Sequence, residues 1–160
     1  LTLVILTLGA LAVSADFRKA VYTMIQKFLP IEMQLTYQVD GEPLEQLPNG
    51  YSDHYVPDGF ERDYEQGYDD AQAFLHVYTD IMTNDFYTVS CAIVQNQNQK
   101  ELFDNEHTKY RKVKMGDVEA LLGEDKNTGY YLVWEDEGIT HTIIGRISIR
   151  ELMLVAQKIY

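Results

Sequence analysis

The chain has 160 residues, of which 46% are hydrophobic and 24% charged, enough for one domain with its own core and a short appendage. Asp and Glu outnumber Lys and Arg by 25 to 13, and the formal net charge of −12 disfavours binding to nucleic acids. We interpret the acidity as a surface that resists self-association, with recruitment of a cation or a basic partner as the alternative.

The amino-terminal residues have the composition of a membrane segment. Residues 1–13 are apolar or small and no charge precedes Asp16, but the run is shorter than a spanning helix. We therefore expect residues 1–14 to be the outer part of a transmembrane helix that begins further upstream. The alternative is a signal peptide cleaved after Ala15. Apolar residues at helical spacing then predict an amphipathic juxtamembrane helix over residues 15–30.

Residues 31–53 are predicted to form a strand and a polar connecting loop. Met33, Leu35 and Tyr37 alternate with polar neighbours, which indicates a strand over residues 31–39. The loop that follows is rich in Pro, Gly and Asp and has too few apolar residues to form core.

The remaining residues, 54–160, are predicted to form the main domain, beginning with strands. Residues 60–68 are expected to be a polar edge strand with Phe60 and Tyr64 turned inward. Residues 71–82 fit either a helical stripe or a strand. We favour a strand, because residues 83–85 then form a hairpin connection to the β-prone run 86–94. The amide-rich residues 95–99 are expected to end that strand.

Further strands and one helix complete this domain. Strands are predicted over residues 107–115, 118–122, 130–134 and 139–144, the last two forming a hairpin. Ser148 and Glu151 match a capping box, and apolar residues at helical spacing predict a helix from Ser148 to about Ile159. The expected fold is α+β: an antiparallel, twisted sheet packed by a carboxy-terminal amphipathic helix, preceded by an amino-terminal membrane or juxtamembrane helix.

The sequence contains no recognisable catalytic motif: no nucleophile elbow, phosphate-binding loop, dinucleotide-binding turn, HExxH or paired CxxC. We therefore predict no catalytic, cofactor-binding or metal-binding residue. The four histidines lie in different predicted elements and are interpreted as surface or core residues. The lone cysteine, Cys91, is expected to be buried, and Asp69 and Asp70 are expected to be solvated. The 12 tyrosines fill a sheet core or, alternatively, line a groove.

Several short motifs follow one another in the last two thirds of the chain. They are Val56-Pro57-Asp58-Gly59-Phe60, Asp104-Asn105-Glu106, Gly116-Asp117-Val118-Glu119-Ala120, Val133-Trp134-Glu135 with Gly138, and Ile147-Ser148 through Glu151-Leu152 to Ala156. In this order they resemble the bacterial family named domain of unknown function 4367. The sequence departs from the family pattern at Asn105, Val155 and Gln157 without breaking the strand and helix pattern.

The resemblance implies a domain outside the membrane, often after one spanning helix, in proteins that include membrane-anchored anti-sigma-factor-like regulators, mainly of Gram-positive bacteria. The family has no established catalytic residues to carry over. Its motif residues are interpreted as structural, with Trp134 as a core anchor, Gly116 and Gly138 in turns and Ser148 as a cap. The full structural signature is Asp104, Glu106, Gly116, Trp134, Gly138, Ser148, Glu151 and Leu152.

The expected function is therefore that of a non-enzymatic extracytoplasmic sensory, regulatory or protein-interaction domain of a single-pass bacterial membrane protein. Its expected partners are the membrane, through the amino-terminal helix, and an unknown protein or small ligand outside the cytoplasm. The alternative is a secreted or anchored carrier of a lipid or peptide, which requires a deep apolar cavity. A filled core with an exposed apolar patch favours protein interaction. A cleft holding a histidine with two carboxylates would favour an enzyme.

Overall fold

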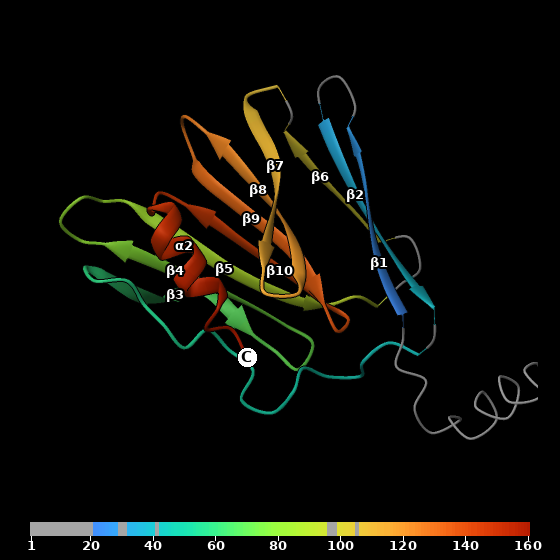
Figure 1. Cartoon of the computed structure of the whole chain (residues 1–160). Coiled ribbons are helices and arrows are strands. Elements are labelled where there is room, and N and C mark those ends of the chain that lie inside the picture. Colours follow the sequence, from blue (N-terminus) through green and yellow to red (C-terminus); the bar gives the residue numbers. More distant parts are fainter. Residues whose placement is uncertain (1–20, 29–31, 41, 96–98, 105) are drawn as a thin grey trace, which may run out of the picture.

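The computed structural model describes residues 21–28, 32–40, 42–95, 99–104 and 106–160 (Figure 1). The predicted transmembrane segment, residues 1–14, and the first part of the predicted juxtamembrane helix, residues 15–20, lie outside these ranges. Within them, no helix combines the length and the apolar character that a membrane span requires. The described residues form a seven-stranded antiparallel sheet, a three-stranded sheet and a short helix packed on the larger sheet.

The seven-stranded sheet is the body of the domain and has the strand order β3-β4-β5-β10-β9-β8-β7. Its strands are β3 (Phe60–Asp69), β4 (Ala73–Asp80), β5 (Phe86–Ile93), β7 (Thr108–Met115), β8 (Val118–Asp125), β9 (Gly129–Asp136) and β10 (Ile139–Gly145). The preference for a strand over residues 71–82 is confirmed by β4, and residues 83–85 lie in its connection to β5. Burial alternates along both strands, as expected where one face of a sheet covers the core.

The three-stranded sheet replaces part of the predicted helix, and its strand order is β1-β2-β6. These strands are β1 (Val21–Phe28), β2 (Glu32–Asp40) and β6 (Gln99–Asp104). The helix predicted for residues 15–30 is therefore wrong over β1, which pairs with β2 along its whole length. Val21, Thr23 and Ile25 are β-branched, which favours an extended backbone once a partner strand is present. The strand predicted over 31–39 is confirmed as β2, whereas β6 was not predicted.

The large sheet is covered on both faces. On one face lie α2 (Ile149–Ala156) and residues 42–59, which we call the strap and which run from β2 to β3 past the carboxy terminus (Figure 1). On the other face, Leu35 and Tyr37 of the small sheet pack against Leu121 and Val133. This follows from the strand period of two, because the neighbouring residues of β8 and β9 belong to the core beneath α2.

Helix α2 is eight residues long and follows the cap residue Ser148. The predicted cap is confirmed, because the Ser148 hydroxyl oxygen accepts a hydrogen bond of 3.1 Å from the Glu151 amide. Leu152 is fully buried, as predicted. The predicted end near Ile159 is wrong: the helix stops at Ala156, because Ile159 instead forms a β-bridge with Asp53 of the strap. Tyr55 of the strap also donates a hydrogen bond to the Glu151 carboxylate.

Strand β3 is the edge strand that was predicted, but it is irregular. Phe60 turns inward as expected and meets the Tyr87 ring edge-on at 5.1 Å between centroids. The inward orientation predicted for Tyr64 is wrong, since this side chain is 81% exposed. The cause is a shift of register between Asp63 and Gly67, which turns the intervening residues away from the sheet.

Candidate functional site

The register of the large sheet brings two buried histidines to the face beneath the strap. His76 on β4 alternates with Phe74 and Tyr78, and all three side chains are buried on that face. His141 on β10 is paired with Trp134 on β9. Both histidines are polar groups in an otherwise apolar layer, so each needs a partner above the sheet. The strap supplies both partners.

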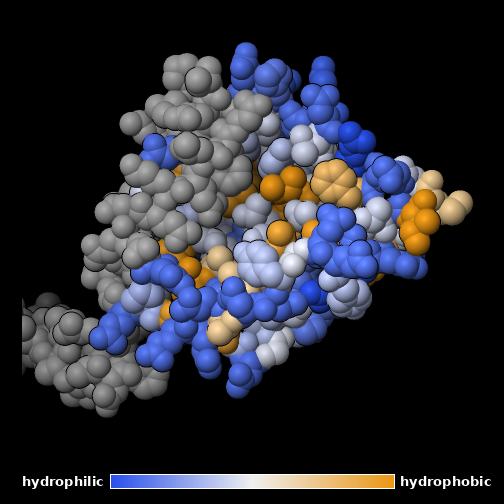
Figure 2. Space-filling view, turned by 180° about the vertical axis from the view of Figure 1, so that it is seen from behind, coloured by the Kyte–Doolittle hydropathy of each residue, from blue (hydrophilic) through white to orange (hydrophobic). Residues whose placement is uncertain are grey.

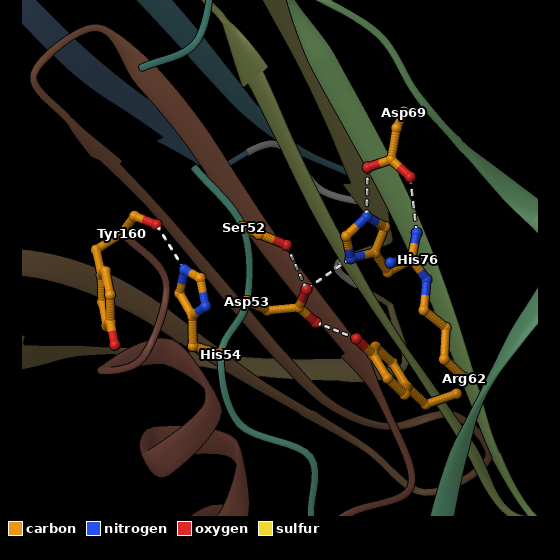
Figure 3. A network of polar contacts seen from close by, with 8 residues as sticks. Ser52, Asp53, His54, Arg62, Asp69, His76 and Tyr160 are labelled. Carbon is orange, nitrogen blue, oxygen red and sulfur yellow. Dashed lines mark hydrogen bonds and ion pairs between the residues drawn. The ribbon is translucent and has the colours of Figure 1, made fainter. Parts of the chain in front are cut away.

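His76 is held between two carboxylates (Figure 3). Its Nδ1 atom lies 2.6 Å from Oδ1 of Asp53 in the strap, and its Nε2 atom lies 2.7 Å from Oδ1 of Asp69 on β3. The side chains of His76 and Asp53 are each 1% exposed, whereas that of Asp69 is 62% exposed. The Tyr78 hydroxyl donates a hydrogen bond of 2.6 Å to the other oxygen of Asp53. We call Asp53, His76 and Asp69 the clasp.

The irregularity of β3 places Asp69 over His76. The Asp63 carboxylate accepts hydrogen bonds from the amides of Glu65 and Gln66, which stabilises the bulge. Gly67 then lies opposite His76 with a positive φ of 100°, and a Cβ atom there would lie 2.1 Å from the Leu75 carbonyl oxygen. Only glycine therefore allows this close approach of β3. Arg62 donates a hydrogen bond of 2.7 Å to the second oxygen of Asp69.

The charges of the clasp follow from these contacts. Burial by itself lowers the pKa of His76, but hydrogen bonds to Asp53 and Asp69 outweigh it and the net pKa is raised. Burial likewise opposes ionisation of Asp53, yet the bonds from His76 and Tyr78 keep its pKa below the usual value. The hydrogen bond from His76 is the main cause of the lowered pKa of Asp69. An imidazolium between two carboxylates is the arrangement in which both ring nitrogens donate.

A histidine with two carboxylates is the pattern that was set out as favouring an enzyme, so the chemistry of the clasp matters. A general base needs one ring nitrogen directed at a substrate or a nucleophile. Both nitrogens of His76 are occupied by carboxylates, and Phe74 stacks on the ring with centroids 4.3 Å apart. The neighbouring Ser52 hydroxyl contacts Asp53, not His76. This geometry suits a charged tie between the strap and the sheet better than it suits catalysis.

The second histidine, His141, sits beside an open pocket. Its Nε2 atom shares a hydrogen bond of 2.6 Å with the Tyr51 hydroxyl of the strap, and its ring stacks on Trp134 at 4.5 Å between centroids. Burial lowers the pKa of His141 to about 4, so this imidazole is neutral at neutral pH. The two histidines therefore hold the same segment of strap by different chemistry, one as a cation and the other as a neutral ring.

Backbone contacts complete the attachment of the strap. The amides of Ser52 and Tyr160 each donate to the other residue's carbonyl oxygen at 3.1 Å, and the His54 amide donates to the Lys158 carbonyl at 2.8 Å. The Tyr55 hydroxyl donates a hydrogen bond of 2.7 Å to the Glu151 carboxylate of α2. The strap is thus tied to the sheet, to α2 and to the carboxy-terminal residues within one short segment.

The structural signature from the sequence is spread over the domain and does not form a site. Trp134 is 4% exposed and belongs to the same core cluster as Leu152 and Ala156, as expected. Gly116 and Gly138 have positive φ angles of 62° and 87° in the turns after β7 and β9. Asp104 ends β6, and Glu106 is exposed beyond it.

The residues of the clasp were missed in the sequence. Asp69 was expected to be solvated, and its side chain is 62% exposed, but it also bonds His76 and Arg62, which was not predicted. Asp53 was placed in a connecting loop. The one local signal was the position of His76, between Phe74 and Tyr78 on the apolar face of a strand, where a polar ring requires a partner. The expectation for Cys91 is met, since this side chain is fully buried.

Comparison with protein-family models identifies a match that covers most of the described domain. Residues 50–159 match the model of the domain of unknown function DUF4367. The chain belongs to the DUF4367 family. The match begins in the strap, so the DUF4367 domain contains the clasp, both buried histidines and α2, and it excludes β1 and β2. Comparison with curated proteins and with solved structures gives no match.

Proposed function

We propose that this DUF4367 domain is a non-enzymatic sensory or regulatory module outside the cytoplasm in a single-pass bacterial membrane protein of the anti-sigma-factor-like kind. The apolar run of residues 1–13 supports the membrane part of the proposal. The resemblance to domains of such regulators supports its placement. Strands β1 and β2 then lie between the membrane segment and the DUF4367 domain in the chain, whereas β6 belongs to the matched region.

The observation that carries the proposal is the attachment of the strap. This segment follows β2 in the chain, and it is tied to the large sheet by Asp53 and Tyr51 next to an open pocket. A ligand in the pocket touches Tyr51 and therefore changes the stability of the strap on the sheet. Because the strap leads back toward the amino terminus, a ligand that binds the attached strap more tightly than the released strap shifts the state of the segment that leads to the membrane side.

A filled core and exposed apolar side chains favour recognition over transport of a lipid. Leu132, Leu152 and Val155 are fully buried between α2 and the sheet, where a carrier would need a deep cavity. Apolar side chains project instead at the turn after β4, where Ile81 is 73% and Met82 is 92% exposed. Figure 2 shows hydrophobic atoms at that end of the molecule, and others nearer the middle of the same face.

The placement outside the cytoplasm is testable with a membrane-impermeant maleimide. The full chain is produced in a Gram-positive host, and an accessible cysteine is introduced as Asp117→Cys in the exposed turn after β7. The matched control is the wild-type chain, whose single cysteine, Cys91, is fully buried and has a raised pKa because of burial. Labelling of the variant in intact cells, with none of the control, is expected. Labelling only after lysis contradicts the proposal.

A further inference from the structure

We infer that the outer edge of β7 binds an extended, acidic segment of a partner protein as an additional strand of the large sheet. The inference rests on the proposed function, because it names a partner class for the regulatory module. Strand β7 ends the strand order of the large sheet, and among the described strands only β8 pairs with it (Figure 1). In an antiparallel pair, half of the backbone amides and carbonyls of a strand point away from its neighbour. An edge strand offers these groups to a further strand.

The two edges of the large sheet differ in regularity. At the far edge, β3 changes register between Asp63 and Gly67, and such a bulge protects an edge against further pairing. Strand β7 instead pairs with β8 at a continuous register from Thr108 to Met115, and it contains neither Pro nor Gly. It therefore presents an uninterrupted template of eight residues.

Strand β7 concentrates positive charge in an acidic chain. It holds four of the 13 basic residues of the chain and no Asp or Glu. All four basic side chains are exposed: Lys109, Arg111, Lys112 and Lys114. Of these, only Lys112 forms an ion pair with another described residue, Glu119 of β8, and an exposed pair of this kind is weak. Glu124 lies opposite Lys109 in the register but forms no ion pair with it. Most of this charge is therefore left to act on a partner.

The cations lie on both faces of the edge. The strand period of two places Lys109 and Arg111 on the face that α2 covers, and Lys112 and Lys114 on the face of the small sheet. A partner strand has the same alternation, so acidic side chains spread along it meet cations on both faces. Opposite charges directly across from each other stabilise a strand pair, and like charges destabilise it. The edge is thus complementary to an acidic strand in backbone and in charge.

The same charges disfavour the other occupants of a free edge. Pairing of β7 with β7 of a second copy would place cations opposite cations. The acidic edge strand of a second copy, β3, is interrupted by its bulge, and its Asp69 already bonds His76 and Arg62. An anionic membrane surface meets a chain whose net charge is −12, and lipid headgroups do not supply a row of alternating amides and carbonyls.

The test measures binding of three end-blocked peptides to the full chain by fluorescence anisotropy. The acidic peptide, Val-Glu-Val-Glu-Glu-Tyr-Glu-Thr, places a Glu opposite each of the four cations in an antiparallel pair with β7. Its analogues carry Gln or Lys in place of Glu. At low salt, the Gln analogue is expected to bind about fourfold or more weakly, since each exposed charge pair changes affinity by about 1.4-fold to fivefold. The Lys analogue is expected to bind most weakly. Equal affinity of the Glu and Gln peptides, or no binding of the acidic peptide, overturns the inference.

Variants locate the binding. The double variant Lys109→Gln and Arg111→Gln is expected to weaken binding of the acidic peptide and to leave the Gln analogue unchanged. The matched control is Arg150→Gln with Lys158→Gln, which removes two exposed positive charges outside β7 and should have little effect. If the control weakens binding as much as the β7 variant does, binding follows the net charge of the chain and the edge is not the site.

Amide exchange distinguishes strand addition from charge attraction alone. At a peptide concentration ten times its Kd, alternate amides of β7 are expected to exchange about tenfold more slowly, while those of β3 are unchanged. Binding without protection of β7 refutes strand pairing. Displacement of the peptide by phosphatidylglycerol vesicles would assign the edge to a membrane surface and also overturn the inference. The cell-labelling experiment does not depend on binding at β7, so the proposed function can stand or fall separately.

Discussion

Replacing Asp53 by Ala should be one of the most damaging single changes in the DUF4367 domain. The substitution removes hydrogen bonds to His76 and Tyr78 and leaves a 1% exposed imidazole without its buried carboxylate. Loss of one partner from a buried ion pair costs about 3 to 5 kcal/mol. Since domains of this size are stable by about 5 to 15 kcal/mol, a fifth or more of the free energy of unfolding is at stake.

Urea denaturation followed by circular dichroism measures this loss directly. Asp58→Ala serves as the control, because this exposed carboxylate should change stability by no more than about 0.5 kcal/mol. Asp53→Asn should be intermediate, since it keeps the shape and one acceptor but loses the charge. If Asp53→Ala costs less than about 1 kcal/mol, Asp53 does not tie the strap to the sheet, and the reasoning from the clasp is refuted.

Four further predictions concern the histidines and α2. Stabilisation by His76 is fully present below its unfolded pKa of about 6.5 and is lost as pH rises through the raised folded pKa, so His76→Gln should abolish an alkaline loss of stability in urea titrations. His141 has the opposite sign: its folded pKa of about 4 means that stability falls as pH drops from the unfolded value toward 4, and His141→Phe should flatten that acidic slope. Ser148→Ala should lower stability by about 0.5 to 2 kcal/mol, and Leu152→Asp should undock α2 and expose the sheet to protease; unchanged resistance would show that the helix is peripheral.

Local signals were sufficient for much of the fold. The cap at Ser148 and the apolar stripe behind it predict α2, because both act within the helix itself. The turn residues 135–138 between two β-prone runs predict the hairpin of β9 and β10 for the same reason. The end of α2 could not be predicted, because Ile159 fits the helical spacing in the sequence but pairs with Asp53 of the strap in the structure.

Contacts between residues that are far apart in the sequence determine the features that were not predicted. The residues of β1 fit a helical stripe as well as a strand, and only the presence of β2 as a partner selects the extended form. The clasp joins Asp53 to a histidine 23 positions later, a spacing that carries no motif. Asp69 reaches His76 only because of the bulge around Gly67. Such contacts depend on register and on irregularities that no local pattern contains.

The coupling between pocket and strap is the central claim, and hydrogen–deuterium exchange tests it most directly. Tyr51, which lines the pocket and bonds His141 from the strap, is replaced by Phe, and exchange is followed at the amides of Ser52 and His54, which bond to the carboxy-terminal residues. Faster exchange at both amides is predicted, with no change in the turn of residues 126–128. If the strap amides exchange at the same rate as before, the contact at the pocket does not hold the strap in place, and the sensory account is contradicted.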